Sequence, residues 1–430
     1  MSLRWFFLLS VAVVVWLLRA LPGFVPADSA ASALVAFGLL TIGGELAGEA
    51  AARLKLPRIT GYLVLGMAFG PYVLALITPS DLDSLRVFEE LALGLIALTA
   101  GGELHVASLR RRWKVIVGIT ASHAAGIFLC AATIFWLVLH IFPFLGTLSP
   151  AQTAAAAALI GIITVAKSPA TTIAVITEMQ AAGNLVDTVL GITVLKDIVI
   201  LILFTWINGV ARGWVGSSGP VSAGVATLAA TVGLSLLAGV VLGVLLGAYL
   251  SKIGLHPEVT VLAVVLVSME IAHGSGLDHL LISMAAGFTA RNLFPAAATG
   301  FLHALERSSP PIYVVFFGLI GAGLDLGVFA VAWAAVLVLF AVRLLLVWSV
   351  TGLAARVLGA DTSVRRWAWM GFVAQAGLSL GLAARVAREL PGFGGTLATV
   401  VVGAVVVNQI AGPILWRYAL IASGEATTGY

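Results

Sequence analysis

The sequence predicts an all-α polytopic membrane protein with two inverted repeats and crossed interrupted helices. Hydrophobic residues make up 61% of the 430 positions and charged residues only 10%, against about 25% in soluble domains. Apolar stretches of about 20 residues follow one another along the chain, and each can cross the ~30 Å hydrocarbon core as a helix. Two of these stretches are broken by glycine, proline and polar residues, which indicates a site near the membrane midplane.

We expect one membrane domain over residues 30–420 and a short cytoplasmic tail over 421–430, because no polar stretch is long enough for a soluble domain. The boundaries before residues 277 and 327 are weakly marked. The 13 expected core helices cover 30–50, 58–78, 84–103, 113–140, 151–177, 184–208, 222–251, 256–274, 277–291, 312–324, 327–355, 366–388 and 395–418.

The N-terminal segment, residues 1–29, has two interpretations. The apolar stretch from Trp5 to Leu18 fits an extra transmembrane helix. Arg4 before it, and the small residues around Ala27 after it, also fit a cleaved signal peptide. In both cases residue 30 begins on the outer side of the membrane.

The charges predict an orientation with both chain ends in the cytoplasm. With the N-terminus inside, the expected outer loops receive Asp81, Asp83 and Asp278, and Arg212 is the exception. Cytoplasmic loops of membrane proteins carry an excess of Lys and Arg, which agrees with this arrangement. The basic residues that fall inside are Arg53, Lys55, Arg58, Arg110, Arg111, Arg112, Lys114, Lys252, Arg307, Arg356, Arg365, Arg366 and Arg417.

Several function classes are disfavoured. The net charge of +4 arises from basic residues in short loops, so it does not indicate nucleic-acid binding. The single cysteine, Cys130, excludes an internal disulfide. The sequence lacks zinc-ligand spacing, a Walker-type phosphate loop and a Gly-x-Ser-x-Gly motif, so we expect no metal, no cofactor and no enzyme activity.

Two segments interrupt otherwise apolar helices. The first runs from Thr164 to Thr172 and contains Lys167, Ser168 and Pro169, and a proline in mid-helix removes a backbone hydrogen bond. The second runs from Val373 to Ser379 and contains Gln375 and Gly377. The freed backbone groups must be satisfied by protein groups or a wet cavity.

A helix with a central polar pair follows each interruption. Lys196-Asp197 comes 29 residues after Lys167, and Asn408-Gln409 comes 33 residues after Gln375. The interruptions lie in the fifth and the twelfth expected helices, seven positions apart, so they cross the membrane in opposite directions. This correspondence predicts inverted repeats over about 30–211 and 256–420.

Asp197 is the candidate centre of an ion and proton site. A carboxylate deep in an apolar helix binds either a proton or a cation, and that competition can couple their transport. A structural ion pair with Lys196 is the alternative, although neighbouring helical residues do not face each other. The expected ion and proton site is Asp197, Lys196, Lys167, Ser168 and Thr164, supported by Arg343, Gln375, Asn408, Pro169 and Gly377.

The charges at this depth leave the cargo open. If Lys167, Lys196, Arg343 and Asp197 were all ionised in one cavity, three positive charges and one negative charge would leave +2, which repels Na⁺ or K⁺. Either some side chains point elsewhere, or a lysine is neutral when the site is loaded and carries the proton, or the cargo is not a cation. His123, in an apolar helix, fits a packed core position better than a ligand.

Several motifs resemble those of the monovalent cation/proton antiporter superfamily, in particular its Kef-like and Nap-like bacterial branch with a sodium/hydrogen exchanger transmembrane domain. The resemblance covers residues 30–420 in order. The runs that carry it are Leu56–Gly66 followed by Gly70-Pro71, Ala100–Leu104, Ala286-Gly287 before Arg291-Asn292, Phe316–Leu319 with Leu324–Leu326 behind it, and Gln375–Gly377.

The resemblance implies a homodimer in the bacterial inner membrane that exchanges Na⁺ or K⁺ for protons, with a core domain moving in an elevator-like manner. It matches Asp197 to the family's ion-binding aspartate and Arg343 to a basic core residue. Two positions depart from the family pattern: Lys196 stands where members have Asp or Asn, and Lys167 stands where they have a small polar residue. Two alternatives therefore remain: an anion or other solute as cargo, or a membrane subunit or sensor that transports nothing.

Overall fold

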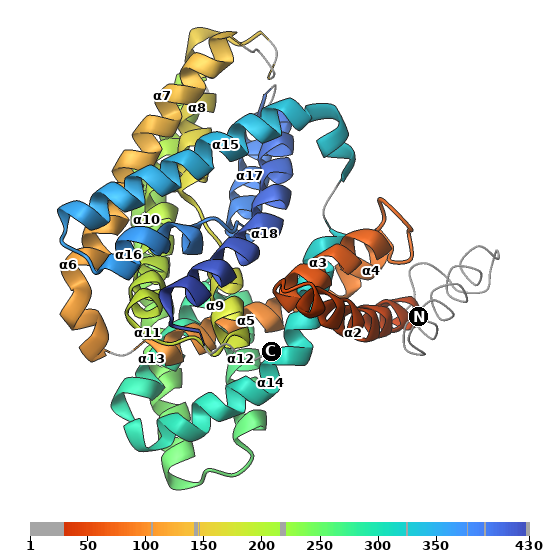
Figure 1. Cartoon of the computed structure of the whole chain (residues 1–430), viewed down its shortest axis with the longest axis vertical. Helices are drawn as coiled ribbons and strands as arrows, with labels where there is room; N and C mark the ends of the chain where they lie inside the picture. The colour runs from red at the N-terminus through yellow and green to blue at the C-terminus, as the bar shows by residue number, and fades with distance from the viewer. Residues whose placement is uncertain are drawn as a thin grey trace. The chain divides into compact units, whose positions relative to one another are not determined.

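The regular structure of the described residues is helical throughout (Figure 1). A computed structural model describes residues 30–104, 106–141, 145, 147–215, 221–323, 326–375, 377–390 and 393–426. The expected N-terminal segment, residues 1–29, lies outside the described residues.

The helices follow one another with short connections. Eight helical spans of the described part, two of which combine neighbouring helices, are long and apolar enough to cross a membrane, so the chain is a multi-pass membrane protein. In chain order the helices are α2 (Ala30–Arg53), α3 (Arg58–Phe69), α4 (Pro79–Ser84), α5 (Arg86–Glu103), α6 (Val106–Ser122), a π-helical turn (His123–Ile127), α7 (Phe128–Ile141), α8 (Pro150–Val165), α9 (Pro169–Glu178), α10 (Asn184–Trp214), α11 (Val221–Lys252), α12 (Pro257–Ser275), α13 (His279–Leu293), α14 (Pro295–Ala322), α15 (Leu326–Val357), α16 (Thr362–Trp367), a 3₁₀ turn (Ala368–Phe372), α17 (Gly377–Glu389) and α18 (Gly394–Ser423).

Two expected boundaries differ most from the observed ones. The helix expected over 58–78 ends at Phe69, because Gly70 precedes Pro71 and has an extended backbone with ψ 172°. The helix expected from residue 312 begins at Pro295, a residue type that suits the first helical turn because it needs no hydrogen-bonded N–H. The weakly marked boundary before residue 277 is confirmed, since α12 ends at Ser275. The count of 13 helices and the inverted repeats stay predictions.

The chain divides into two compact units that each combine distant parts of the sequence. Within the described residues, the first unit contains 30–102, 239–275 and 282–323. The second contains 103–238, 276–281 and 326–426. Both interrupted segments, together with Lys196 and Asp197, belong to the second unit.

In the first unit, glycines bring α3 and α14 into close contact. A Cβ atom on Gly66 would lie 2.1 Å from the carbonyl oxygen of Gly318, and one on Gly321 would lie 2.2 Å from that of Leu63. Small residues at helix contacts are typical of membrane proteins, because association there depends on close packing. Larger side chains at Gly66 or Gly321 would separate the two helices.

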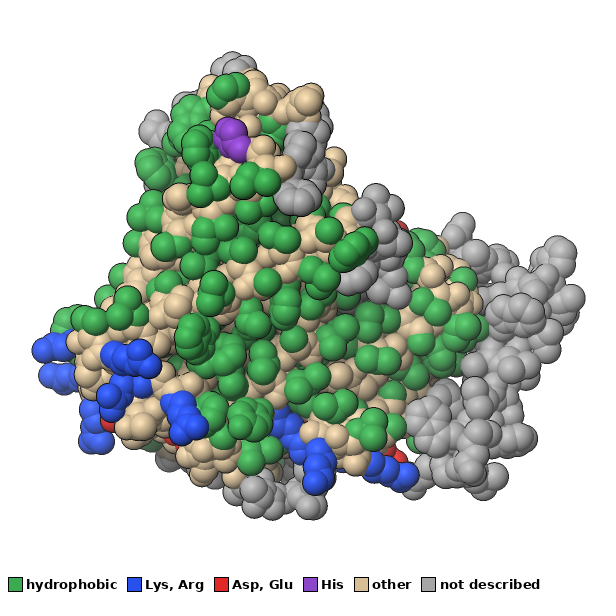
Figure 2. Space-filling model, turned by 45° about the horizontal axis from the view of Figure 1, so that its top comes forward, with side chains coloured by type: hydrophobic (Ala, Val, Ile, Leu, Met, Phe, Trp, Pro, Cys, Tyr) green, Lys and Arg blue, Asp and Glu red, His purple; other side chains and the backbone are tan. Residues whose placement is uncertain are grey.

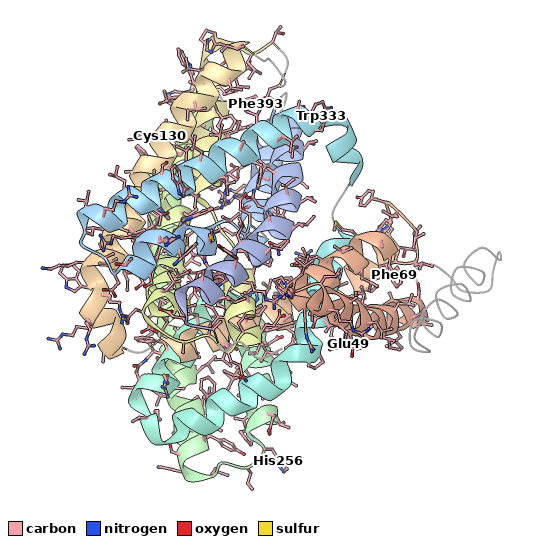
Figure 3. The ribbon with its side chains drawn as sticks, viewed as in Figure 1. Glu49, Phe69, Cys130, His256, Trp333 and Phe393 are labelled. Atoms are coloured by element: carbon pink, nitrogen blue, oxygen red, sulfur yellow. The ribbon has the colours of Figure 1, made fainter. Side chains whose placement is uncertain are left out.

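In the second unit, large apolar side chains cover the outer surfaces of α7 and α15. On α7, Leu129 is 59% exposed and Ile141 is 74% exposed. Cys130, the single cysteine, is also exposed on this helix (Figure 3). On α15, Trp348 is 54% exposed and Leu353 is 64% exposed. Such a surface suits contact with lipid tails.

The space-filling view shows how side chains of different kinds are distributed. Hydrophobic side chains are spread over the visible face, and Lys and Arg side chains occur there in small groups (Figure 2).

Candidate ion-binding site

The first predicted interruption is confirmed. Helix α8 ends at Val165 and α9 begins at Pro169, with Lys167 and Ser168 in the non-helical link. Proline cannot continue α8 because it lacks an N–H and its ring clashes with the preceding turn. The Ser168 hydroxyl then caps α9 by accepting the N–H of Thr171 at 3.2 Å.

The second predicted interruption is also confirmed. After the 3₁₀ turn ends at Phe372, the chain is non-helical through Gln375, and α17 begins at Gly377. The two interruptions lie against each other, because the N–H of Ser168 donates to the carbonyl oxygen of Ala374 at 2.8 Å. The structure therefore brings together two segments about 200 residues apart.

Arg343 of α15 joins both interruptions. Its side chain is 1% exposed, and each of its five N–H groups has an acceptor. Nε donates to the carbonyl of Thr164 at 3.1 Å. Nη1 donates to the carbonyl of Val373 at 2.6 Å and to the Asn408 Oδ1 at 3.0 Å. Nη2 donates to the carbonyls of Ala166 and Phe372, both at 2.9 Å.

These carbonyls lie at the ends of α8 and of the 3₁₀ turn. Carbonyls at helix C-termini have no partner within the helix and carry a partial negative charge. The guanidinium of Arg343 thus meets backbone oxygens rather than pointing its N–H groups toward a cargo ion. The supporting role of Arg343 in transport stays a prediction.

Gln375 and Asn408 extend this network. The Gln375 Nε2 donates to the carbonyls of Ile163 and Ala166, both at 3.1 Å. The Asn408 Nδ2 in turn donates to the Gln375 Oε1 at 3.0 Å. The structure thereby connects three residues that the sequence named as supports: Arg343, Gln375 and Asn408.

Lys167 is fully buried in the first interruption. Its Nζ donates to the hydroxyl oxygens of Thr193 at 2.5 Å and Thr172 at 3.2 Å. The Thr193 hydroxyl donates its own hydrogen to the Val189 carbonyl, so it can only accept from Lys167. The hydrogen-bond partners of the Lys167 ammonium are therefore hydroxyls and not a carboxylate.

Lys196 and Asp197 do not form an ion pair. The Lys196 side chain is fully buried, and its Nζ lies 5.3 Å from the centroid of the Phe372 ring. Neither this Nζ nor the buried Oδ1 of Asp197 has a hydrogen-bond partner among the described residues. Asp197 as a whole residue keeps partial exposure. The alternative of a structural Lys196–Asp197 pair is therefore not observed.

Two residues expected at the ion site use their hydroxyls elsewhere. The Thr164 hydroxyl donates to the Ile160 carbonyl of its own helix at 2.7 Å. The Ser168 hydroxyl is engaged in the cap of α9. Sequence reasoning missed Thr193 and Phe372, although Thr193 precedes Lys196 by three residues and so shares a helix face with it.

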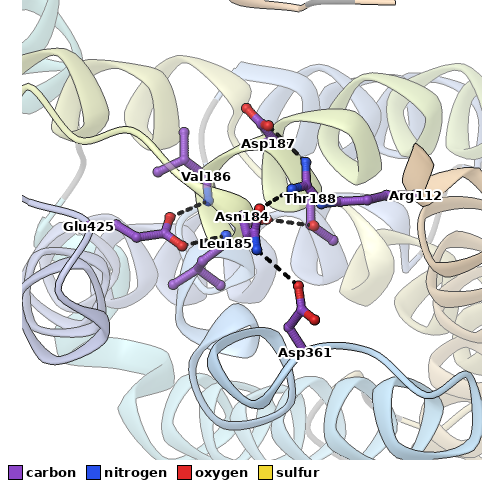
Figure 4. Close-up of polar contacts among 8 residues, drawn as sticks. All are labelled: Arg112, Asn184, Leu185, Val186, Asp187, Thr188, Asp361 and Glu425. Carbon is purple, nitrogen blue, oxygen red and sulfur yellow. Dashed lines mark hydrogen bonds and ion pairs between the residues drawn. The ribbon is translucent and has the colours of Figure 1, made fainter. Parts of the chain in front are cut away.

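The N-terminus of α10, the helix that carries Lys196 and Asp197, is held by the C-terminal part of the chain (Figure 4). The two carboxylate oxygens of Glu425 accept the N–H groups of Leu185 at 2.7 Å and Val186 at 2.9 Å. Gly183 precedes the helix with φ 153°, and a Cβ there would lie 2.3 Å from the Glu425 Cδ. The carboxylate compensates the partial positive charge of the helix N-terminus.

Two further contacts fix the same end of α10. Arg112 of α6 forms an ion pair with Asp187 at 2.8 Å and also bonds Asn184. The Asn184 amide donates to Asp361, the residue before α16, at 3.1 Å. None of these contacts was predicted from the sequence. Across the described residues, no group of three or more His, Cys, Asp or Glu side chains could hold a metal ion.

The chain is similar to known membrane transport proteins. The family model described as sodium/hydrogen exchanger, transmembrane, matches residues 36–417. The glutathione-regulated potassium-efflux system protein KefC of Klebsiella pneumoniae is 27% identical over 402 residues, which are 87% of this chain and 59% of that protein. KefC of Salmonella typhi is 27% identical over 332 residues, 74% of this chain and 49% of that protein. The chain thus spans about half to three fifths of the length of these relatives.

Two solved structures of the sodium proton antiporter MjNhaP1 from Methanocaldococcus jannaschii share the fold. The structure at pH 8 has a TM-score of 0.65 and 18% identity, and it covers 90% of this chain and 95% of that chain. An electron-microscopy structure has a TM-score of 0.75 and 19% identity, and it covers 93% of this chain and all of that chain. At this level of identity the likeness concerns the fold.

Proposed function

The chain belongs to the sodium/hydrogen exchanger transmembrane family, and from this premise we propose that it exchanges a monovalent cation, Na⁺ or K⁺, for protons. The observation that carries the proposal is the Oδ1 of Asp197, which is buried and meets no hydrogen-bond donor among the described residues. An ionised carboxylate oxygen in such surroundings is costly unless a proton or a cation neutralises it. Competition between the two for Asp197 couples their movement.

The proposed charge balance excludes Arg343 from the cargo site, because its five N–H groups meet backbone and amide oxygens. Lys167 is the proposed proton carrier that accompanies Asp197. Its two hydroxyl acceptors match the two N–H groups of a neutral amine, so the third proton of the ammonium is the one without a partner. With all four groups ionised, the site would carry a net charge of +2. Excluding Arg343 and removing one proton from Lys167 as a cation binds lowers this charge to zero, so the cation is no longer repelled.

An elevator-like motion is the proposed means of alternating access. The support is the way Arg343 and the Ser168–Ala374 bond join the two interruptions into one connected group within the second unit. A site held this firmly moves between the two sides as part of a rigid body, since opening it would break several buried hydrogen bonds. A homodimer in the inner membrane with a cytoplasmic C-terminus belongs to the same proposal.

The test is proton movement in proteoliposomes. Internal pH is followed after addition of sodium, potassium or lithium salts, in protein with the native sequence and in the Asp197→Asn and Asp83→Asn variants. Asp83 is an exposed carboxylate of α4 in the first unit and serves as the matched control. We expect cation-driven proton movement in the native protein and in Asp83→Asn, and none in Asp197→Asn. Equal movement in all three proteins contradicts the assignment of Asp197.

A second candidate keeps the fold and changes the cargo to an anion or a carboxylate-bearing solute. The observation that favours it is the Lys196 ammonium, which is buried without a hydrogen-bond acceptor among the described residues. The same liposomes loaded with a labelled anion separate the two functions, since only anion transport is independent of the added cation. Absence of flux of either kind favours the remaining alternative, a membrane subunit or sensor.

A further inference from the structure

His123 lies at an irregular point of the second unit. Helix α6 ends at Ser122, and His123–Ile127 form a π-helical turn before α7 begins. Turns of this kind are rare and frequently occur at functional sites. The His123 side chain is fully buried, and its ring packs edge to face against Phe372, with 5.0 Å between the ring centroids.

The hydrogen bonds around His123 determine where its neutral ring carries the proton. Its Nε2 lies 2.8 Å from the Thr351 hydroxyl oxygen. The Thr351 hydroxyl donates its hydrogen to the Val347 carbonyl, so toward His123 it can only accept. Nε2 is therefore the donor, and Nδ1 is left with a free lone pair. This Nδ1 is buried and has no donor among the described residues.

The Phe372 ring thus lies next to two groups without hydrogen-bond partners among the described residues. One is the His123 Nδ1, which can accept a proton, and the other is the Lys196 Nζ, which can donate one. The Nζ of Lys196 is 5.3 Å from the centroid of the ring against which His123 packs. The charged groups close enough to act electrostatically on His123 are Lys196, Arg343 and Lys167. All five N–H groups of Arg343 have acceptors, and Lys167 bonds two threonines. Of these three, Lys196 alone has no acceptor for its N–H groups in the part of the chain that the structure describes.

We propose that Lys196 and His123 share one proton and exchange it during transport. The step moves a proton from the Lys196 ammonium to the Nδ1 lone pair of His123, leaving a neutral amine and an imidazolium, so the total charge of the pair is unchanged. The inference rests on the proposed function, to which it adds a second proton-carrying pair. Lys196 is adjacent to Asp197 in the chain. Transfer of the proton to His123, which follows α6, therefore moves positive charge away from the residue next to Asp197.

Transport measurements test the role of His123. Gln in place of His123 can keep an N–H toward Thr351 and cannot carry the proton. We expect His123→Gln to lower cation-driven proton movement by about tenfold or more and to remove one transition from its pH profile. His140→Gln is the matched control, because His140 is an exposed histidine of α7, and we expect this variant to keep the native rate and pH profile. A wild-type rate and pH profile in His123→Gln overturns the inference.

A spectroscopic measurement tests the pair without transport. In bilayers containing ¹⁵N-histidine-labelled protein, the His123 signal is identified by its loss in His123→Gln. The neutral ring is expected to carry its proton on Nε2, and Lys196→Met is expected to shift the pH at which Nδ1 is protonated. Two results overturn the inference. One is a neutral ring that carries its proton on Nδ1, and the other is a protonation pH of His123 that is the same in Lys196→Met as in the native protein. Failure of the proposed function is distinguished from failure of this inference by the native protein itself, which would then show no cation-driven proton movement.

Discussion

Replacing Arg343 with methionine removes the donor for carbonyls at both helix interruptions. The Ala166 carbonyl keeps a second donor, the Gln375 amide at 3.1 Å. The carbonyls of Thr164, Phe372 and Val373 lose the Arg343 N–H groups, and so does the Asn408 Oδ1. Each buried acceptor left without a partner costs about 1–3 kcal/mol, so the four acceptors together predict a loss of about 4–12 kcal/mol of stability. Lysine, with three N–H groups instead of five, should recover part of this loss.

The assay is thermal unfolding of purified protein in detergent, followed by tryptophan fluorescence and by elution as a monodisperse species. Arg356→Met is the matched control, since Arg356 lies on the same helix and is exposed. We expect the control to change stability by no more than about 0.5 kcal/mol. If Arg343→Met unfolds at the same temperature as Arg356→Met, the hydrogen bonds assigned to Arg343 do not hold the interruptions together.

Three further predictions follow from individual contacts. Lys167→Met should abolish cation-driven proton movement while Asp197-dependent cation binding persists, as measured by isothermal titration; retained proton movement would exclude Lys167 as the carrier. Glu425→Ala removes the carboxylate that caps α10 and should lower stability by about 1 kcal/mol in the same unfolding assay, with no such change if the cap is dispensable. Gly66→Ala should destabilise the α3–α14 contact, because its Cβ would meet the Gly318 carbonyl at 2.1 Å. Gly38→Ala, which meets no atom within 4 Å, should not, and equal effects of the two would argue against that contact.

The interruptions could be predicted from the sequence because their causes are local. Pro169 cannot continue α8 wherever the rest of the chain lies, and Ser168 before it is a favourable helix cap. The end of α3 was missed although Gly70-Pro71 marks it, because the apolar residues that follow resemble a continuing helix. The apolar pattern alone gives the membrane class and does not give each boundary.

The partners of the buried charges could not be predicted, because they come from distant parts of the chain. Sequence reasoning added Arg343 to the positive charge of the site, whereas its position beside five oxygens depends on how α15 packs on both interruptions. His123 was interpreted as a packed core residue. Its burial agrees with that, but the lone pair of Nδ1 becomes evident only from the Thr351 bond. Spacing along one helix indicates shared faces and gives no hydrogen-bond direction.

The crossing of the interruptions has a consequence for the synthesis of the protein. Residues 164–168 enter the membrane early, yet their partners on Arg343, Ala374 and Gln375 are synthesised about 180–210 residues later. Until then the exposed carbonyls at the end of α8 have no protein donor, and each such group costs several kcal/mol in hydrocarbon. A nascent chain that has inserted only its first half must therefore keep this segment in contact with water or with the insertion machinery. The first half can be fully inserted in the bilayer only after the second half has been synthesised and has supplied the donors for these carbonyls.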